Sequence, residues 1–166
     1  MTFKKIILGD TEEIKILSQE ASSIVKEYYD PLLGSEQNDY MINQFQSVSS
    51  LTEQLQKGYQ YYFVCENDKN IGFLAFVPKE NELYLSKFYL EKSARGKGYA
   101  RTMMNFVIEN ARKMKAASIT LNVNKHNVTK YIYEKLGFVR IRSEKIDIGS
   151  GYYMDDYVYE YQLLKK

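Results

Sequence analysis

Cysteine, histidine and proline are scarce in this sequence of 166 residues, which contains one Cys, one His and two Pro. A single cysteine, Cys65, cannot close a disulfide within the chain, and the only histidine, His126, gives it no second soft ligand for zinc. No metal centre is therefore expected. With only Pro31 and Pro78, and with no repeat or low-complexity tract, the sequence shows no linker between domains.

Long hydrophobic runs are also missing. The first ten residues contain three consecutive aliphatic residues, Ile6, Ile7 and Leu8, which is far short of a signal-peptide core. No later run approaches the roughly 20 apolar residues that a membrane span needs. We therefore expect a cytoplasmic protein without a membrane partner. Lys and Arg form no run that resembles a nucleic-acid-binding arm, so no nucleic-acid partner is expected either.

The chain has the size and composition of one ordinary globular domain. Hydrophobic residues make up 45% and charged residues 27%, so we expect a single domain over residues 1–166, alone or paired with a copy of itself. The charge is unevenly distributed: 7 Lys and Arg stand against 12 Asp and Glu up to Glu80, and 16 against 9 after it. This asymmetry suits two ligands of opposite charge, although surface charge also serves solubility alone.

Hydrophobic periodicity predicts a mixed α+β fold. Strands are predicted at residues 3–8, 61–66, 71–77, 83–90, 118–123, 138–147 and 153–164, with a turn at 67–70. Helices are predicted from a cap at Asp10 to about residue 29, at 39–45, from Ser50 to Gly58, from Gly98 to about 114, and at 128–136. The strand, helix and strand between 83 and 123 form a right-handed crossover joining parallel strands, whereas the hairpins at both ends are antiparallel. The result is a mostly antiparallel sheet of six to seven strands flanked by about four helices.

The segment from Ala94 to Ala100, ARGKGYA, places two glycines where a strand gives way to a helix. The first turn of a helix exposes unpaired N–H groups and a positive dipole end, and glycine lets a phosphate approach that backbone. Arg95, Lys97 and Arg101 add positive charge. The same glycines are also typical of a simple tight turn, and the segment matches neither a Walker loop nor a dinucleotide fingerprint.

Two motifs in this chain resemble those of the GNAT superfamily of N-acetyltransferases. Arg95, Gly98 and Ala100 match its pyrophosphate loop, Arg/Gln-x-x-Gly-x-Gly/Ala, and Tyr133 to Phe138 match its Tyr-x-x-x-Gly-Phe helix end. The predicted order of elements is also similar to that family's order over most of the chain. The resemblance implies an acetyl-CoA-dependent N-acetyltransferase in which acetyl-CoA lies between two central parallel strands that splay apart.

The resemblance also implies roles for individual residues. The end of the first splayed strand would offer backbone groups to the pantetheine arm, and the glycine loop and following helix start would hold the pyrophosphate. These cofactor-binding positions are Phe88, Tyr89, Leu90, Arg95, Gly96, Lys97, Gly98, Tyr99, Ala100 and Arg101. The family's CoA-contacting asparagine corresponds to Asn127, whose other role is to cap the next helix. Because the spacing to the tyrosine is one residue short, His126 is the alternative for that position.

Tyr133 matches the tyrosine that acts as the family's general acid. Acetyl transfer to an amine releases the CoA thiolate, which needs a proton, and a tyrosine hydroxyl can supply it. In a chain with 16 tyrosines, a packed aromatic residue is the structural alternative.

A general base cannot be assigned from the sequence. Relatives often carry a glutamate on one of the splayed strands, but the matching positions here hold Ser86 or Tyr84, and Asn122. The base is therefore a group elsewhere, a water chain, or bulk solvent acting on the neutral fraction of the amine.

Aromatic and acidic residues indicate an amine as the acceptor, because both attract an ammonium group. The candidate contacts are Tyr28, Tyr29 and Asn122. The resemblance also implies acceptor contacts from the last strand loop, residues 149–156, where Asp155 and Asp156 adjoin aromatic residues. The prediction is direct acetyl transfer from acetyl-CoA to a primary amine of a small molecule or polyamine, without a metal. The alternatives are a protein or peptide N-acetyltransferase and a catalytically weak CoA-binding regulatory module. Cys65, on a strand, is expected to be a buried apolar residue and not a nucleophile.

Overall fold

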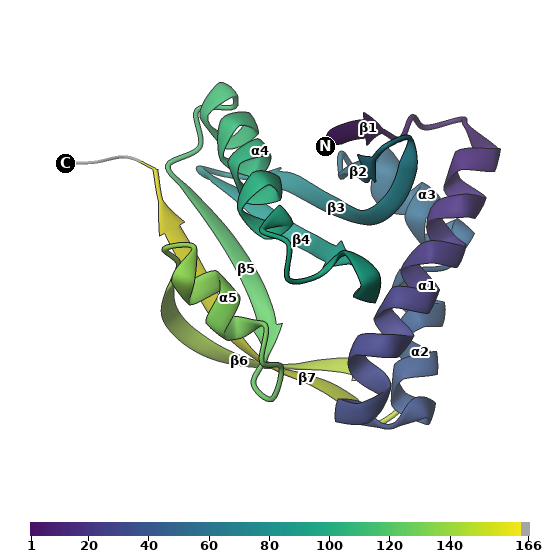
Figure 1. The fold of residues 1–166 in the computed structure, drawn as a ribbon. Coiled ribbons are helices and arrows are strands. Elements are labelled where there is room, and N and C mark those ends of the chain that lie inside the picture. The colour runs from purple at the N-terminus through teal and green to yellow at the C-terminus, as the bar shows by residue number, and fades with distance from the viewer. Residues whose placement is uncertain (164–166) are drawn as a thin grey trace. The chain divides into compact units, whose positions relative to one another are not determined.

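The computed structural model describes residues 1–163, which form seven strands, five α-helices and one 3-10 turn (Figure 1). The strands are β1 Thr2–Lys5, β2 Gln60–Glu66, β3 Lys69–Lys79, β4 Glu82–Leu90, β5 Ser118–Asn124, β6 Val139–Gly149 and β7 Tyr152–Gln162. The helices are α1 Thr11–Leu33, α2 Ser35–Phe45, α3 Val48–Gln56, α4 Tyr99–Lys113 and α5 Lys130–Lys135, and the 3-10 turn is Lys92–Ala94. Residue 164, the end of the last predicted strand, lies outside the described residues.

The sheet has the order β1-β2-β3-β4-β5-β7-β6 and is mostly antiparallel, with β4 and β5 parallel. This confirms the predicted α+β class and the parallel crossover through α4, with five helices where about four were expected. The chain divides into two compact units, one of Met1–Phe76 with Lys87–Tyr99 and one of Val77–Ser86 with the chain from Ala100 onward. A single domain over residues 1–166 stays a prediction.

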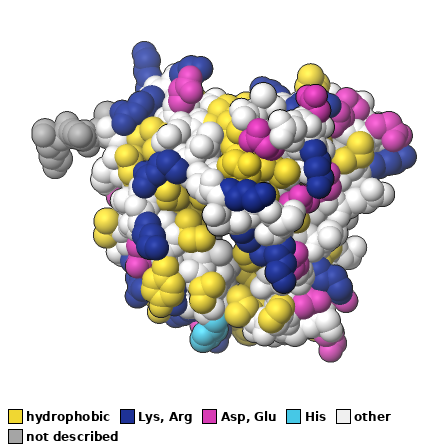
Figure 2. Space-filling model, viewed as in Figure 1, with side chains coloured by type: hydrophobic (Ala, Val, Ile, Leu, Met, Phe, Trp, Pro, Cys, Tyr) yellow, Lys and Arg dark blue, Asp and Glu magenta, His cyan; other side chains and the backbone are white. Residues whose placement is uncertain are grey.

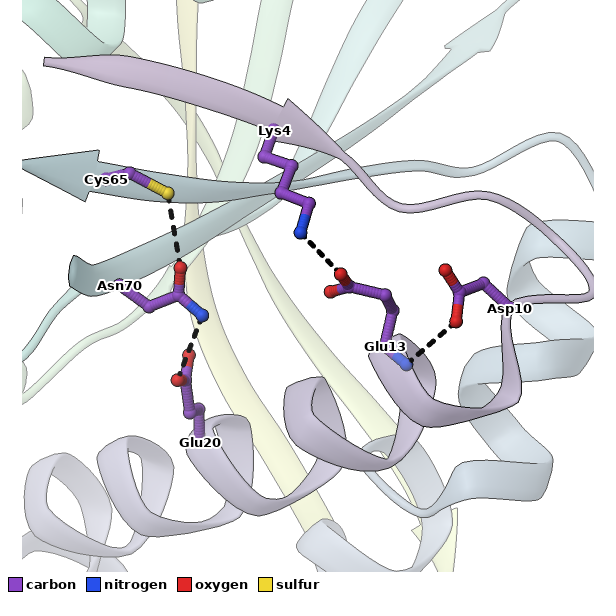
Figure 3. A network of polar contacts seen from close by, with 6 residues as sticks. All are labelled: Lys4, Asp10, Glu13, Glu20, Cys65 and Asn70. Atoms are coloured by element: carbon purple, nitrogen blue, oxygen red, sulfur yellow. Dashed lines mark hydrogen bonds and ion pairs between the residues drawn. The ribbon is translucent and has the colours of Figure 1, made fainter. Parts of the chain in front are cut away.

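The first unit packs α1 and α3 onto strands β1, β2 and β3. Register pairs such as Thr2↔Cys65 and Val64↔Gly72 join the three strands in antiparallel order. Fully buried Leu17, Leu51 and Phe73 belong to its core, which gives these amphipathic elements their stability. As predicted, Asp10 caps α1, and its carboxylate accepts a hydrogen bond from the Glu13 backbone N–H at 3.2 Å (Figure 3).

The end of α1 differs from the prediction. The helix was expected to stop near residue 29, before Pro31, but it continues through the proline to Leu33. Pro31 lies in the last turn, where its missing N–H removes only one helical hydrogen bond. Gly34, with φ 82°, then ends the helix and donates its N–H to the Asp30 carbonyl at 3.0 Å.

Three further predicted boundaries were wrong: the start of α2, the cap of α3 and the turn between β2 and β3. Helix α2 begins at Ser35, four residues before the predicted start. The cap of α3 is Ser47, whose hydroxyl accepts from the Ser50 N–H at 3.3 Å, so the Ser50 cap inferred from spacing is incorrect. The turn predicted at 67–70 is shorter and consists of Asn67 and Asp68. Both residues have positive φ, which is the backbone conformation of a two-residue turn that matches the twist of a hairpin.

The second unit contains the parallel pair and the C-terminal strands. β4 and β5 pair from Glu82↔Ser118 to Tyr84↔Thr120, and β7 runs antiparallel to β5 with Asn124 opposite Asp156. Helix α4 buries four apolar side chains along one face: Met103, Met104, Val107 and Ala111. The divergence of the two parallel strands beyond these pairs stays a prediction.

Candidate active site

The glycine loop between β4 and α4 leaves its backbone open. Gly96 and Gly98 have φ of 77° and 79°, and a side chain at either position would meet no atom within 4 Å. Glycine is therefore required by the backbone conformation and not by crowding. Lys97 is exposed between the two glycines, and Tyr99 opens the 15-residue helix α4. Such a helix start offers N–H groups to an anion.

Arg95 supports this loop through its own side chain. Its guanidinium donates two hydrogen bonds to the Leu90 carbonyl, at 3.1 and 3.0 Å, and forms an ion pair with Glu27 at 2.6 Å. It also lies over the ring of Tyr28, 4.1 Å from the centroid. Arg95 thus ties the loop to α1 and to the end of β4, and most of its hydrogen-bonding capacity is already used within the chain.

Further cations follow at the start of α4. Arg101 is exposed, and its guanidinium makes one long contact of 3.5 Å with the Lys135 carbonyl. Ala100 is partly buried in the same first turn. The charges that face solvent in this segment are those of Lys97 and Arg101.

The residues at the end of β4 pack against aromatic side chains of α1. The Tyr89 ring lies 5.5 Å from that of Tyr28 and 5.3 Å from that of Phe73, and its hydroxyl is 3.4 Å from the Tyr29 hydroxyl. A side chain on Gly72 would come within 2.2 Å of the Tyr89 carbonyl oxygen, so β3 and β4 approach closely here. Tyr28 and Tyr29, two predicted acceptor contacts, belong to this packed cluster, and Phe88 is partly buried one residue earlier.

Tyr133 and Asn127 both lie in the second unit. Tyr133 is partly buried, its ring 6.0 Å from Phe138, and its carbonyl accepts from the Phe138 N–H at 3.0 Å. Gly137 has φ 102° and faces the Tyr161 ring, so the Gly-Phe pair closes the end of α5. Asn127 is 4% exposed, and its side chain accepts from the Thr129 N–H at 3.0 Å. His126, the single histidine, is exposed at the surface, where it is drawn in cyan (Figure 2).

Asn122, the third predicted acceptor contact, is part of a polar cluster in the second unit. Its side-chain oxygen accepts from the Tyr84 hydroxyl at 3.2 Å, and its amide nitrogen lies 3.4 Å from both Glu144 Oε2 and Asp156 Oδ2. We call these four residues, Tyr84, Asn122, Glu144 and Asp156, the Asn122 cluster. They come from β4, β5, β6 and β7, because the register places Asp156 beside Asn124 and opposite Glu144.

The two carboxylates of this cluster have different environments. Burial raises the pKa of Asp156 to about 6, and the charges of Asp155 and Glu144 act in the same direction. Glu144 is hydrogen-bonded by Arg142 at 2.8 Å, which lowers its pKa. The sequence placed Asp156 among the acceptor-side carboxylates, but its burial was not predicted. The available signal was its position two residues before the buried Val158, which puts both side chains on one face of β7.

Cys65 takes no part in an exposed reactive site. It is buried, and its thiol donates to Asn70 Oδ1 at 3.2 Å, while Asn70 in turn donates to Glu20 (Figure 3). Burial raises the pKa of the Cys65 thiol, so the thiolate is disfavoured. This agrees with the buried apolar role expected for it.

Residues 1–163 contain neither a metal-binding cluster nor a membrane-spanning helix. No group of three or more His, Cys, Asp or Glu side chains in this range is arranged to hold a metal ion. No helix in the same range is long and apolar enough to cross a membrane.

Comparison with known families agrees with this fold and these motifs. The acetyltransferase (GNAT) domain matches residues 14–153, which is most of the chain. The chain therefore belongs to the GNAT family of acetyltransferases, and its activity is that of an N-acetyltransferase. No curated protein matches the sequence.

Solved structures share the fold over nearly the whole chain. The PaiA N-acetyltransferase of Thermoplasma acidophilum, in complex with coenzyme A, is 19% identical over 98% of this chain and 99% of that one, with a TM-score of 0.76. A GCN5-related N-acetyltransferase of Rhodopseudomonas palustris is 12% identical over 98% and 95%, with a TM-score of 0.79. A spermidine N-acetyltransferase chimera of Vibrio cholerae SpeG and hSSAT is 20% identical over 97% and 94%, with a TM-score of 0.66. At these identities the likeness shows the fold.

Proposed function

We propose that the protein transfers the acetyl group of acetyl-CoA directly to a primary amine of a small molecule or polyamine. The observation that carries the acceptor class is the position of Asn122 between two carboxylates, Glu144 and Asp156, within 3.4 Å of each. Negative charge gathered on one face of a sheet favours a cationic acceptor. The similarity to a protein named as a spermidine N-acetyltransferase supports the same class.

The glycine loop fits the pyrophosphate of acetyl-CoA. The open space beside Gly96 and Gly98 leaves room for a phosphate against the backbone, and the exposed Lys97 and Arg101 supply positive charge. The family resemblance assigns Phe88, Tyr89 and Leu90 to the pantetheine arm and Asn127 to a CoA contact, and we propose these roles here. Bound there, acetyl-CoA supplies an activated acetyl thioester.

Arg95 would contribute to this site by shaping the loop. Its bonds to the Leu90 carbonyl and to Glu27 keep the chain turned between β4 and α4. The phosphate would then be held chiefly by backbone N–H groups and by the two exposed cations.

Tyr133 would provide the proton that the departing thiolate needs. Its ring is held against Phe138, and the backbone bond from Phe138 N–H to its carbonyl fixes the end of α5. A tyrosine hydroxyl can donate its proton to a thiolate that leaves during the reaction.

A thiol-release assay tests the proposal. Acetyl-CoA is mixed with the protein and with each of four primary amines: putrescine, spermidine, an aminoglycoside and a peptide with an N-terminal alanine. Release of CoA and a mass gain of one acetyl group on a small amine support the proposal. Acetylation of the peptide alone indicates a peptide acetyltransferase, and CoA binding without release with any amine indicates a binding module; either outcome overturns the proposed acceptor class.

A further inference from the structure

We propose that Asp156 binds the ammonium group of the acceptor and accepts its proton, with Asn122 and Tyr84 as positioning residues. This inference rests on the proposed amine acetyltransferase function and gives it the general base that the sequence did not supply. It assigns the role to β7, whereas the strand positions first considered hold only Tyr84, Ser86 and Asn122.

Asp156 is a buried carboxylate without a cation of its own. It is 3% exposed, and no Lys, Arg or His among residues 1–163 lies within ion-pair distance of it. The cations around the Asn122 cluster have other partners. Lys125 pairs with Asp155 at 3.0 Å, Arg142 pairs with Glu144 at 2.8 Å, and Lys79 lies over the Tyr84 ring, 4.3 Å from its centroid. Burying a carboxylate is unfavourable unless a positive charge compensates it, and a substrate ammonium would do so.

The Asp156 carboxylate accepts few hydrogen bonds from the described residues. Its one contact with Asn122 is 3.4 Å long, at the outer limit of a hydrogen bond. Because the Tyr84 hydroxyl donates to the Asn122 side-chain oxygen, the amide nitrogen of Asn122 is turned toward the carboxylates. The amide thus orients Asp156 while most of its acceptor sites remain for a ligand.

An unpartnered hydroxyl on the same face also points to a ligand. Thr120 is 3% exposed, and its Oγ1 has no hydrogen-bond partner among the described residues. It lies two residues before Asn122 on β5, on the same face of the strand, and pairs in register with Tyr84. A buried hydroxyl left unpaired is unfavourable, so a polar group of an acceptor or a bound water is expected beside it.

The charges around Asp156 suit a base that works near neutral pH. The pKa of Asp156 is raised to about 6, chiefly by burial and also by the charges of Asp155 and Glu144, while the Asn122 hydrogen bond and Lys125 act in the opposite direction. Asp156 is therefore largely ionised at pH 7.5, yet it binds a proton far more readily than an exposed aspartate.

In the proposed step, Asp156 acts as the base and the acceptor amine acts as the nucleophile. The ammonium nitrogen gives one proton to an Asp156 carboxylate oxygen, directly or through one water. The freed lone pair of that nitrogen forms the C–N bond to the acetyl carbonyl carbon, the C–S bond breaks, and its electron pair leaves with sulfur. The sulfur takes the proton of Tyr133, which regains a proton from solvent. The second amine proton is lost to solvent, and Asp156 returns its own proton to solvent before the next turnover.

The test compares Asp156→Asn with the matched variant Asp155→Asn. Asp155 is the neighbouring residue, its side chain is 46% exposed, and its charge is already paired with Lys125. For both variants and the wild type, kcat/KM for the best amine of the panel is measured from pH 5 to 9, and acetyl-CoA binding is measured by calorimetry. We expect Asp156→Asn to lose at least about 100-fold in kcat/KM at pH 7.5 and to lose the acidic limb near pH 6, with acetyl-CoA affinity unchanged.

Asp155→Asn is expected to stay within about 3-fold of wild type and to keep the limb, shifted slightly to lower pH because one neighbouring negative charge is gone. If Asp156→Asn retains wild-type kcat/KM or the acidic limb, the inference is overturned while the acetyltransferase function stands. If no amine is acetylated by the wild type, the proposed function fails, and the ammonium site is judged by thermal stabilisation with spermidine at pH 7.5. Stabilisation that Asp156→Asn abolishes would then support the site, and equal or absent stabilisation would overturn it.

Discussion

The glycine loop and the Asn122 cluster build binding capacity in opposite ways. The loop offers backbone N–H groups, and the residues that shape it are consecutive, from Leu90 to Arg101. The cluster offers side chains from four strands, with Tyr84 and Asp156 separated by 72 positions in the sequence. A backbone site can therefore be recognised from a short local motif, whereas a side-chain site forms only when the strands pair in register.

Beyond the Asp156 variant, the largest effect is expected at Tyr133, where the side-chain chemistry itself is removed. Tyr133→Phe should lower kcat about 100-fold, because the thiolate would leave without its proton donor, while acetyl-CoA affinity stays within 2-fold. Steady-state thiol release and calorimetry check both. Tyr131→Phe, an exposed tyrosine on the same helix, should keep wild-type turnover. Equal turnover in the two variants would remove the acid role.

The second prediction concerns the pH dependence of folding stability, which the Asn122 cluster should affect and the glycine loop should not. Because the folded protein raises the pKa of Asp156 to about 6 from 3.8, the native state binds its proton more tightly than the unfolded state. The resulting destabilisation is absent below about pH 4, grows as pH rises through 6, and is complete above that. Asp156→Asn should therefore gain about 3 kcal/mol relative to wild type between pH 4 and pH 8, as measured by urea unfolding. A pH-independent difference between the two proteins would contradict the buried, ionised carboxylate.

The third prediction tests the open backbone of the loop. Gly98→Ala should weaken acetyl-CoA binding about 10-fold, because the new methyl group occupies the space left for a phosphate and strains a positive φ. Gly58→Ala is the matched control: it has φ 97° and the same open surroundings at the end of α3. Both variants should lose about 1 kcal/mol of stability, and only Gly98→Ala should lose affinity in calorimetry. Equal affinities would place the pyrophosphate elsewhere.

The smallest effect is expected at Arg95, where the loop depends on a side chain. Arg95→Lys keeps the charge but not the forked pair of bonds to the Leu90 carbonyl, so we expect a loss of about 1 kcal/mol in thermal unfolding. Acetyl-CoA affinity should fall less than 5-fold, with the same salt dependence as wild type, because Lys97 and Arg101 remain. A steep loss of affinity and of salt dependence would show that Arg95 itself carries the phosphate contact.

Much of the fold could be predicted because its elements have strong local signals. Runs of β-branched and aromatic residues marked β2 and β3, alternating apolar residues marked β5, and spacings of three and four marked α4. The boundaries at Pro31 and Ser47 were missed, because helix ends depend on which neighbouring group satisfies the last backbone bonds. The burial of Asp156 could not be predicted, because it depends on β5 and β6 pairing on either side of β7.

The amino-acid order by itself determined the secondary structure, the glycine loop and the motif around Tyr133, because each depends on residues within one or two turns of chain. Only the tertiary structure decided that Arg95 is bonded to Leu90 and Glu27, and that Asn122 lies between Glu144 and Asp156. Those contacts follow from strand register and helix packing. The difference in pKa between the two carboxylates has the same origin, since desolvation and ion pairing depend on neighbours that are distant in the sequence.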